Sequence, residues 1–115
     1  VGLEDRRWVL ESIGSRKTPA AIKGVFVNFD SAKKSAGGNS GCNVFGGEYA
    51  VSGSRIRIRE IVSTMRACIE DDRMKIEREF LDALREADRF EIRDGRLFLS
   101  RGRELLLTLR GESRN

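Results

Sequence analysis

The sequence contains no histidine, only two cysteines and a single proline among 115 residues. Without histidine it lacks the commonest general base and the commonest zinc ligand, and a Cys–His nucleophile is excluded. Two cysteines alone cannot hold a structural zinc ion. No run of about 18 apolar residues is present, so no segment resembles a membrane-spanning helix, and no signal peptide is recognisable. We therefore expect no metal site, no cofactor and no catalytic residue.

The remaining composition is typical of one globular domain spanning residues 1–115. A chain of this length can bury roughly 65% of its unfolded surface in a single core. Apolar residues make up 39% of the chain and charged residues 35%, with a formal net charge of +4. The 18 acidic residues are interleaved with the 22 basic ones, so this small excess does not favour nucleic acid as the partner.

A glycine-rich stretch at residues 37–49 lies between two apolar, strand-like segments and contains five glycines, two asparagines and a cysteine. Glycine tolerates positive φ and close backbone approach, so the stretch predicts a tight irregular turn leading into a strand with a β-bulge. Two functional interpretations stay open: a loop that binds a ligand through exposed N–H groups, and a phosphate-cradling loop. The phosphate motifs are incomplete, because no helix follows and the Gly-Lys-Ser/Thr ending is absent.

Apolar and polar residues alternate along most of the chain at the period of a β-strand. Residues 15–23 and 31–38 read as loops, and residues 111–115 as a polar tail. Asp94-Gly95 is a strong signal for a two-residue hairpin, and Trp8 is the expected aromatic anchor of the core. Strands are predicted at about residues 8–13, 25–29, 47–51, 55–61, 89–93, 96–100 and 104–109.

The strand predicted at residues 55–61 alternates most cleanly, which places its isoleucines toward the core and its arginines toward solvent. Such an arginine row can bind phosphate or RNA, but it is more often the solvated face of an antiparallel strand. The two lysines in the loop at 31–38 read as a solvated loop tip. The candidate basic surface consists of Lys33, Lys34, Arg55, Arg57 and Arg59.

One helix is predicted, from about Asp72 to Ala87, with acidic residues 70–72 at its start, where they favour the partial positive charge of the N-terminus. Apolar residues recur at helical spacing on one side, and charged residues, Glu77 among them, are expected to cover the other sides. The predicted fold is mainly β with one helix: a partly open antiparallel β-barrel capped by that helix. The alternative is a flatter α+β sheet with the helix on one face.

Five segments follow one another along the chain: Trp8-Val9-Leu10, Gly41-Cys42-Asn43, Ser63-Thr64-Met65, Glu79-Phe80-Leu81, and Leu97 with Leu99. Together they resemble the META domain family, which includes the heat-shock protein HslJ. The resemblance covers residues 3–110 and implies a lipocalin-like, partly open barrel, with no established catalytic residue. The residues that match the family pattern, for which we expect structural roles, are Trp8, Gly41, Cys42, Asn43, Gly47, Tyr49, Thr64, Met65 and Cys68.

The same resemblance implies a bacterial cell-envelope setting, as a periplasmic protein or an outer-membrane lipoprotein linked to stress. It suggests a non-enzymatic binding or accessory protein whose partner is another envelope protein or an apolar ligand. Membrane association would then come from a lipid anchor outside this chain.

Cys42 and Cys68 allow two structural interpretations. In an oxidising compartment they form a disulfide, stabilising the fold by about 3–4 kcal/mol; in a reducing one they are small buried apolar residues. Two functional alternatives also stay open: a thiol redox sensor, although the Cys-x-x-Cys spacing is missing, and a nucleic-acid-binding barrel that uses the basic surface.

Overall fold

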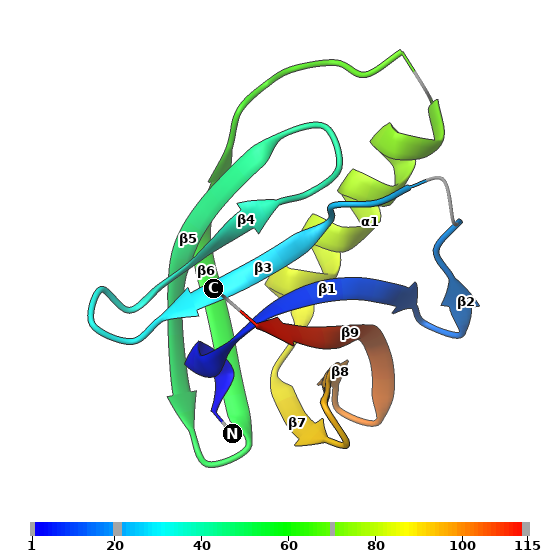
Figure 1. The fold of residues 1–115 in the computed structure, drawn as a ribbon. Helices are drawn as coiled ribbons and strands as arrows, with labels where there is room; N and C mark the ends of the chain where they lie inside the picture. Colours follow the sequence, from blue (N-terminus) through cyan, green and yellow to red (C-terminus); the bar gives the residue numbers. More distant parts are fainter. Residues whose placement is uncertain (1, 20–21, 70, 114–115) are drawn as a thin grey trace.

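The computed structural model describes residues 2–19, 22–69 and 71–113. Within these residues, nine antiparallel strands form one ring-like sheet, an open barrel with a single α-helix beside it (Figure 1). The prediction of a mainly β, partly open barrel is thus confirmed, and the flatter sheet is not what forms. The elements are η1 (Leu3–Asp5), β1 (Arg6–Ile13), β2 (Arg16–Lys17), β3 (Phe26–Asp30), β4 (Ser35–Asn39), β5 (Val44–Ser52), β6 (Arg55–Ser63), α1 (Asp71–Glu86), β7 (Arg89–Arg93), β8 (Arg96–Arg101) and β9 (Glu104–Ser113).

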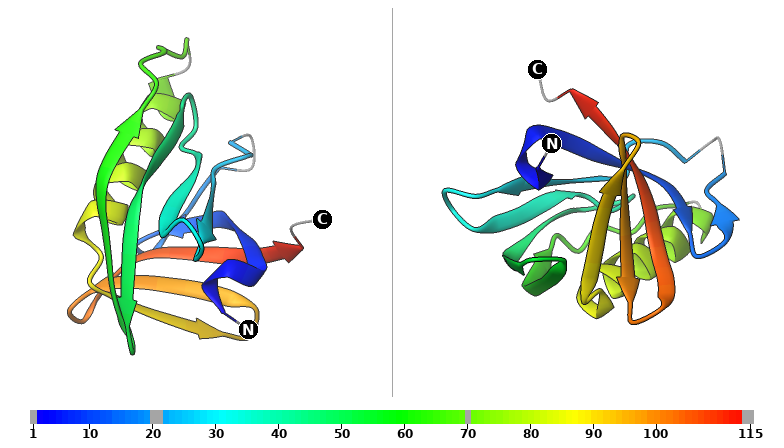
Figure 2. Two further views of the ribbon diagram at one scale, coloured as in Figure 1. Left: turned by 90° about the vertical axis from the view of Figure 1, so that its left-hand side faces the viewer. Right: turned by 90° about the horizontal axis from the view of Figure 1, so that it is seen from below.

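The ring follows the order β1-β3-β4-β5-β6-β7-β8-β9 and closes where β9 pairs with β1. This closing ladder is long, from Arg6 opposite Ser113 to Ile13 opposite Leu107. Two junctions are narrow: β1 meets β3 through two residue pairs, and β6 meets β7 through Arg55 opposite Arg89. The sheet therefore opens at these two places, and α1 packs beside β6 (Figure 2).

Three segments expected to be irregular contain strands. Residues 16–17, within the loop expected at 15–23, form β2 beside β1. Residues 35–39 form β4 between β3 and β5, and residues 111–113 extend β9 along β1. A Cβ atom on Gly38 would lie 2.1 Å from the Phe26 carbonyl oxygen. The glycines led to the expectation of a loop. The structure shows that they are needed because the backbone of the neighbouring strands leaves no space for side chains. The expected turn is therefore confined to residues 40–43, between β4 and β5.

The interior of the barrel is filled by side chains. Trp8, Phe29 and Leu107 are fully buried on the strands, and Phe80 and Leu84 are fully buried on α1. The predicted apolar stripe of the helix therefore faces the core. None of the helices among the described residues is long and apolar enough to cross a membrane.

Two aromatic side chains hold the N-terminal turn η1 against the ring. The Trp8 indole N–H donates to the Leu3 carbonyl at 2.8 Å, and the Tyr49 hydroxyl donates to the Glu4 carboxylate at 2.5 Å. Burial, followed by this bond to Glu4, raises the pKa of the Tyr49 hydroxyl far above its ordinary value. Tyr49 therefore remains a neutral donor at physiological pH.

A β-bulge on β6 explains the glycine at position 47. Gly46 pairs with Val62 and Glu48 pairs with Arg59, so β6 carries one extra residue, and Glu60 adopts a φ of 56°. A Cβ on Gly47 would lie 2.8 Å from the Arg59 carbonyl oxygen. The bulge was expected on the glycine-rich strand itself, but the extra residue belongs to its neighbour.

We predict that Gly47→Ala lowers the free energy of unfolding by about 2 kcal/mol, because backbone atoms must move to admit the methyl group. Gly46→Ala is the matched control, since no atom lies within 4 Å of the Cβ position at Gly46, and it should change stability by less than about 0.5 kcal/mol. Urea denaturation measures both variants. Equal losses would show that the bulge does not require glycine.

Candidate functional site

The carboxylate of Glu77, on α1, lies at the centre of the glycine-rich loop. Its Oε1 accepts hydrogen bonds from the Ser40 hydroxyl at 2.6 Å and from the backbone N–H groups of Cys42 and Asn43 at 3.1 and 2.9 Å. Its Oε2 accepts one from the Asn43 side-chain amide at 2.8 Å. The loop thus does bind an anion through its N–H groups, but the anion belongs to the protein's own helix.

The position of Glu77 corrects the sequence-based expectation. Its side chain was predicted to cover a solvated side of the helix, whereas Glu77 is 7% exposed. Burial alone would raise the pKa of this carboxyl, but the hydrogen bonds from Ser40, Asn43 and Cys42 together lower it. Glu77 is consequently charged at neutral pH and holds the loop to α1.

Asn43 extends this network to the segment that follows β6. Its side-chain oxygen accepts hydrogen bonds from the Thr64 hydroxyl at 2.8 Å and the Arg66 backbone N–H at 2.7 Å, and its amide donates to the Arg66 carbonyl at 3.1 Å. The buried Asn43, which is 4% exposed, therefore links the loop that carries Gly41-Cys42-Asn43 to the segment that carries Thr64 through hydrogen bonds.

A disulfide joins the same two regions: Cys42 is bonded to Cys68. Of the two readings of the cysteines, the structure shows the bridged one. Such a bond is consistent with a location outside the cytoplasm. Met65, between Thr64 and Cys68, points into solvent instead of contributing to the core.

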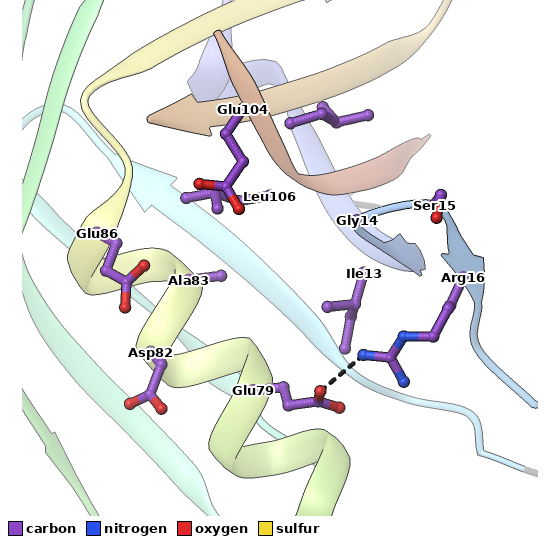
Figure 3. Close-up of a pocket in the computed structure, with 11 residues that line it drawn as sticks. Ile13, Gly14, Ser15, Arg16, Glu79, Asp82, Ala83, Glu86, Glu104 and Leu106 are labelled. Carbon is purple, nitrogen blue, oxygen red and sulfur yellow. Dashed lines mark hydrogen bonds and ion pairs between the residues drawn. The ribbon is translucent and has the colours of Figure 1, made fainter. Parts of the chain in front are cut away.

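A shallow groove of about 410 Å³ runs beside α1 and collects several carboxylates (Figure 3). Glu79 accepts a hydrogen bond from Arg16 at 2.6 Å, and Arg101 bridges Glu86 and Glu104 at 3.0 Å each. Asp82 pairs with Arg85, so three arginines face the four carboxylates of the groove. No group of side chains within the described part of the chain is arranged to hold a metal ion.

The remaining predicted residues divide between two places. Arg55, Arg57 and Arg59 line one groove on the outer face of β6. Lys33 and Lys34 lie exposed in the β3–β4 turn and do not line that groove. Of the acidic cluster at the helix start, Glu70 and the side chain of Asp71 lie outside the described residues.

A family model for the META domain matches residues 1–113. The chain belongs to the META domain family. The resemblance inferred from the sequence motifs is therefore confirmed, and the loop–helix network described above is how this META domain uses its Gly-Cys-Asn motif.

Solved structures share the fold of this META domain. An NMR structure of a protein from Burkholderia xenovorans is 27% identical, covering 97% of this chain and 85% of that one, with a TM-score of 0.75. A crystal structure of a DUF4847 family protein from Bacteroides vulgatus is 14% identical, covering 98% and 96%, with a TM-score of 0.72. A further NMR structure is 21% identical, covering 94% and 90%, with a TM-score of 0.73. No curated protein matches the sequence.

Sequence reasoning missed the roles of Glu77 and Ser40. One signal was available: Glu77 follows Ile76, so it lies beside the apolar stripe and not opposite it. Nothing in the sequence indicates that the loop at residues 40–43 folds against that position.

We predict that Glu77→Gln lowers the free energy of unfolding at pH 7 by about 2 kcal/mol, since it removes a charged acceptor from four donors. The lowered pKa of Glu77 gives the native protein stability that is present above the unfolded value of about 4.3 and is lost as the pH falls below it. The gap between wild type and variant should therefore shrink below about pH 4 in urea titrations.

The exposed Glu86 provides a matched control on the same helix, because Glu86→Gln removes one surface ion pair. That variant should change stability by less than about 0.5 kcal/mol at any pH. A pH-independent gap for Glu77→Gln would contradict the role assigned to its charge.

We further predict that reduction of the Cys42–Cys68 bond, which closes a separation of 26 residues, lowers the free energy of unfolding by about 3 kcal/mol in the chain-entropy model. The measurement is denaturation with and without reductant, with alkylation and intact mass as the check on the bond. The Cys42→Ala/Cys68→Ala double variant should have the same free energy of unfolding with and without reductant. Identical curves for oxidised and reduced wild type would refute this.

Proposed function

We propose that this META domain is a non-enzymatic accessory protein of the bacterial envelope that acts by contacting another protein through its outer surface. The packed interior favours a protein partner over an apolar ligand inside the barrel. Trp8, Phe29 and Phe80 occupy the space that a lipocalin-like ligand would need.

The observation that carries the proposal is the exposed apolar segment between β6 and α1. Met65 is 95% exposed and Ile69 is 97% exposed, and Val62 and Val44 lie exposed on the adjoining strands. This segment is fixed to the barrel at Arg66 by Asn43 and at Cys68 by the disulfide. Apolar side chains displayed on an anchored segment are typical of interaction sites.

The cellular setting follows from the family and the disulfide taken together. A disulfide-bonded domain fits the periplasm, and a lipid anchor outside this chain would attach it to a membrane. A stress-related role accords with the resemblance to HslJ. A redox sensor is disfavoured because Cys42 is buried and bonded. A nucleic-acid-binding barrel is disfavoured because the groove lined by Arg55, Arg57 and Arg59 has no aromatic residue in its lining on which bases could stack.

Site-specific photo-cross-linking in the producing cells tests the proposal. We expect a photoreactive residue at Met65 or Ile69 to give a discrete protein adduct, because these side chains would lie in the interface. The same residue at Lys33, which is exposed in the β3–β4 turn, is the control and should give none. Absence of an adduct at 65 and 69, or equal adducts at all three positions, would overturn the proposed function.

A further inference from the structure

We propose that the outer face of the β5–β6 hairpin docks an extended acidic segment of the protein partner, a proposal that rests on the proposed function. The surface concerned, here termed the arginine groove, has a volume of about 280 Å³. Its lining includes the three arginines Arg55, Arg57 and Arg59, the small residues Ala50 and Ser52, and one acidic residue, Asp88.

The strand register leaves the three arginines uncovered. Arg55 lies opposite Ser52 and Arg57 lies opposite Ala50, so small residues face long ones across the hairpin. All three arginines are exposed, whereas Ile56 and Ile58 between them point into the core. Their guanidinium groups therefore line an outward-facing groove and are not packed over a large neighbour.

These arginines also lack ion-pair partners. No side chain among the described residues forms an ion pair with Arg55, Arg57 or Arg59, although Glu48 lies opposite Arg59 in the ladder. Some arginines elsewhere on the barrel are paired, as Arg96 is with Glu11 and Arg101 is with Glu86 and Glu104. What distinguishes the groove is that three arginines without an ion pair among the described side chains follow one another on the same face of one strand. The arginine groove thus has an excess of positive charge, with three arginines and one carboxylate, that of Asp88, in its lining.

The β-bulge joins this charge to the exposed apolar residues. Because β6 carries an extra residue at Glu60, Val62 returns to the same outer face as Arg59, beside Gly46 and Val44. The face therefore runs from three arginines to an apolar end that continues toward Met65. Without the bulge, Val62 would point to the opposite face of the sheet.

The spacing of the arginines fits an extended peptide. Arginines at alternate positions of a strand repeat about every 6.7 Å, which is also the repeat of alternate side chains in an extended segment. Carboxylates at every second position of such a segment can each meet one guanidinium, a pairing whose fork geometry adds strength. Apolar residues at one end of the segment would then reach Val62 and Val44.

Two other anionic partners fit less well. The groove lining contains no aromatic ring on which bases could stack. Membrane-binding basic clusters usually carry four to eight positive residues, more than this row offers.

The test uses a labelled twelve-residue peptide with glutamate at every second position and two leucines at one end. We expect it to bind the oxidised protein at low salt, to weaken as salt is raised, and to shift the backbone NMR signals of residues 46–52 and 55–62. Replacing the three groove arginines by glutamine (Arg55→Gln, Arg57→Gln, Arg59→Gln) should weaken binding roughly 10- to 100-fold, since each of three exposed ion pairs contributes a factor of about two to five.

The matched control removes three exposed arginines away from the groove and loses the same charge: Arg78→Gln, Arg85→Gln and Arg103→Gln. It should bind the peptide within about twofold of wild type, because ion pairs act locally at moderate salt. Equal weakening in both triple variants, shifts outside the hairpin, or equal binding of a lysine-for-glutamate peptide would overturn the proposal. So would tighter binding to phosphatidylglycerol vesicles or a single-stranded oligonucleotide than to the peptide.

Failure of docking at the arginine groove and failure of the proposed function give different results. If Met65 cross-links to a protein in cells and the groove variant leaves that adduct unchanged, the partner exists but the groove does not dock it. If no position cross-links, the proposed function itself fails, whatever the peptide does in solution. A folded groove variant, shown by its unchanged NMR signals in the core, excludes unfolding as the cause of lost binding.

Discussion

The contact between the Glu77 carboxylate and the loop at residues 40–43 is the interaction on which the arrangement of helix and barrel depends. Four donors converge on this carboxylate, three of them on one oxygen. A buried charge is stable only when it is well hydrogen-bonded, so the loop and α1 must form together. Asn43 and the Cys42–Cys68 bond then fix the segment after β6 to the same loop.

Neighbouring strands of the barrel approach each other closely, and large side chains occupy its interior. Gly38 and Gly47 lie where a Cβ would meet neighbouring backbone oxygens, at Phe26 and Arg59 respectively. The fully buried Trp8 and Phe80 fill the interior from opposite elements. Because the interior is occupied by side chains, a partner can contact this domain only through its outer surface. The proposed function therefore relies on surface contacts and not on a ligand enclosed in the barrel.

The two features of that outer surface have a common origin in β5 and β6. The bulge at Glu60 sets Val62 on the face of the arginine row, and the anchored segment beyond β6 carries the exposed Met65 and Ile69. One face of β6 changes from positively charged to apolar along the strand. It therefore suits a partner segment that carries acidic residues opposite the arginines and apolar residues opposite the apolar end. The disulfide keeps this apolar end attached to the barrel.

The sequence by itself determined the fold class, the helix, the DG hairpin at Asp94 and the family, because strand alternation, helical spacing and turn chemistry are local properties. It did not reveal that the glycines of β4 lie in a strand. Glycine is required at Gly38 because the backbone of the neighbouring strand β3 lies too close to admit a Cβ atom. It also placed Glu77 in solvent, because only the folded chain brings residues 40–43 to that face of α1. The pairing of the two cysteines and the absence of ion pairs for Arg55, Arg57 and Arg59 among the described side chains were likewise decided by tertiary structure, which sets the distances between residues far apart in the chain.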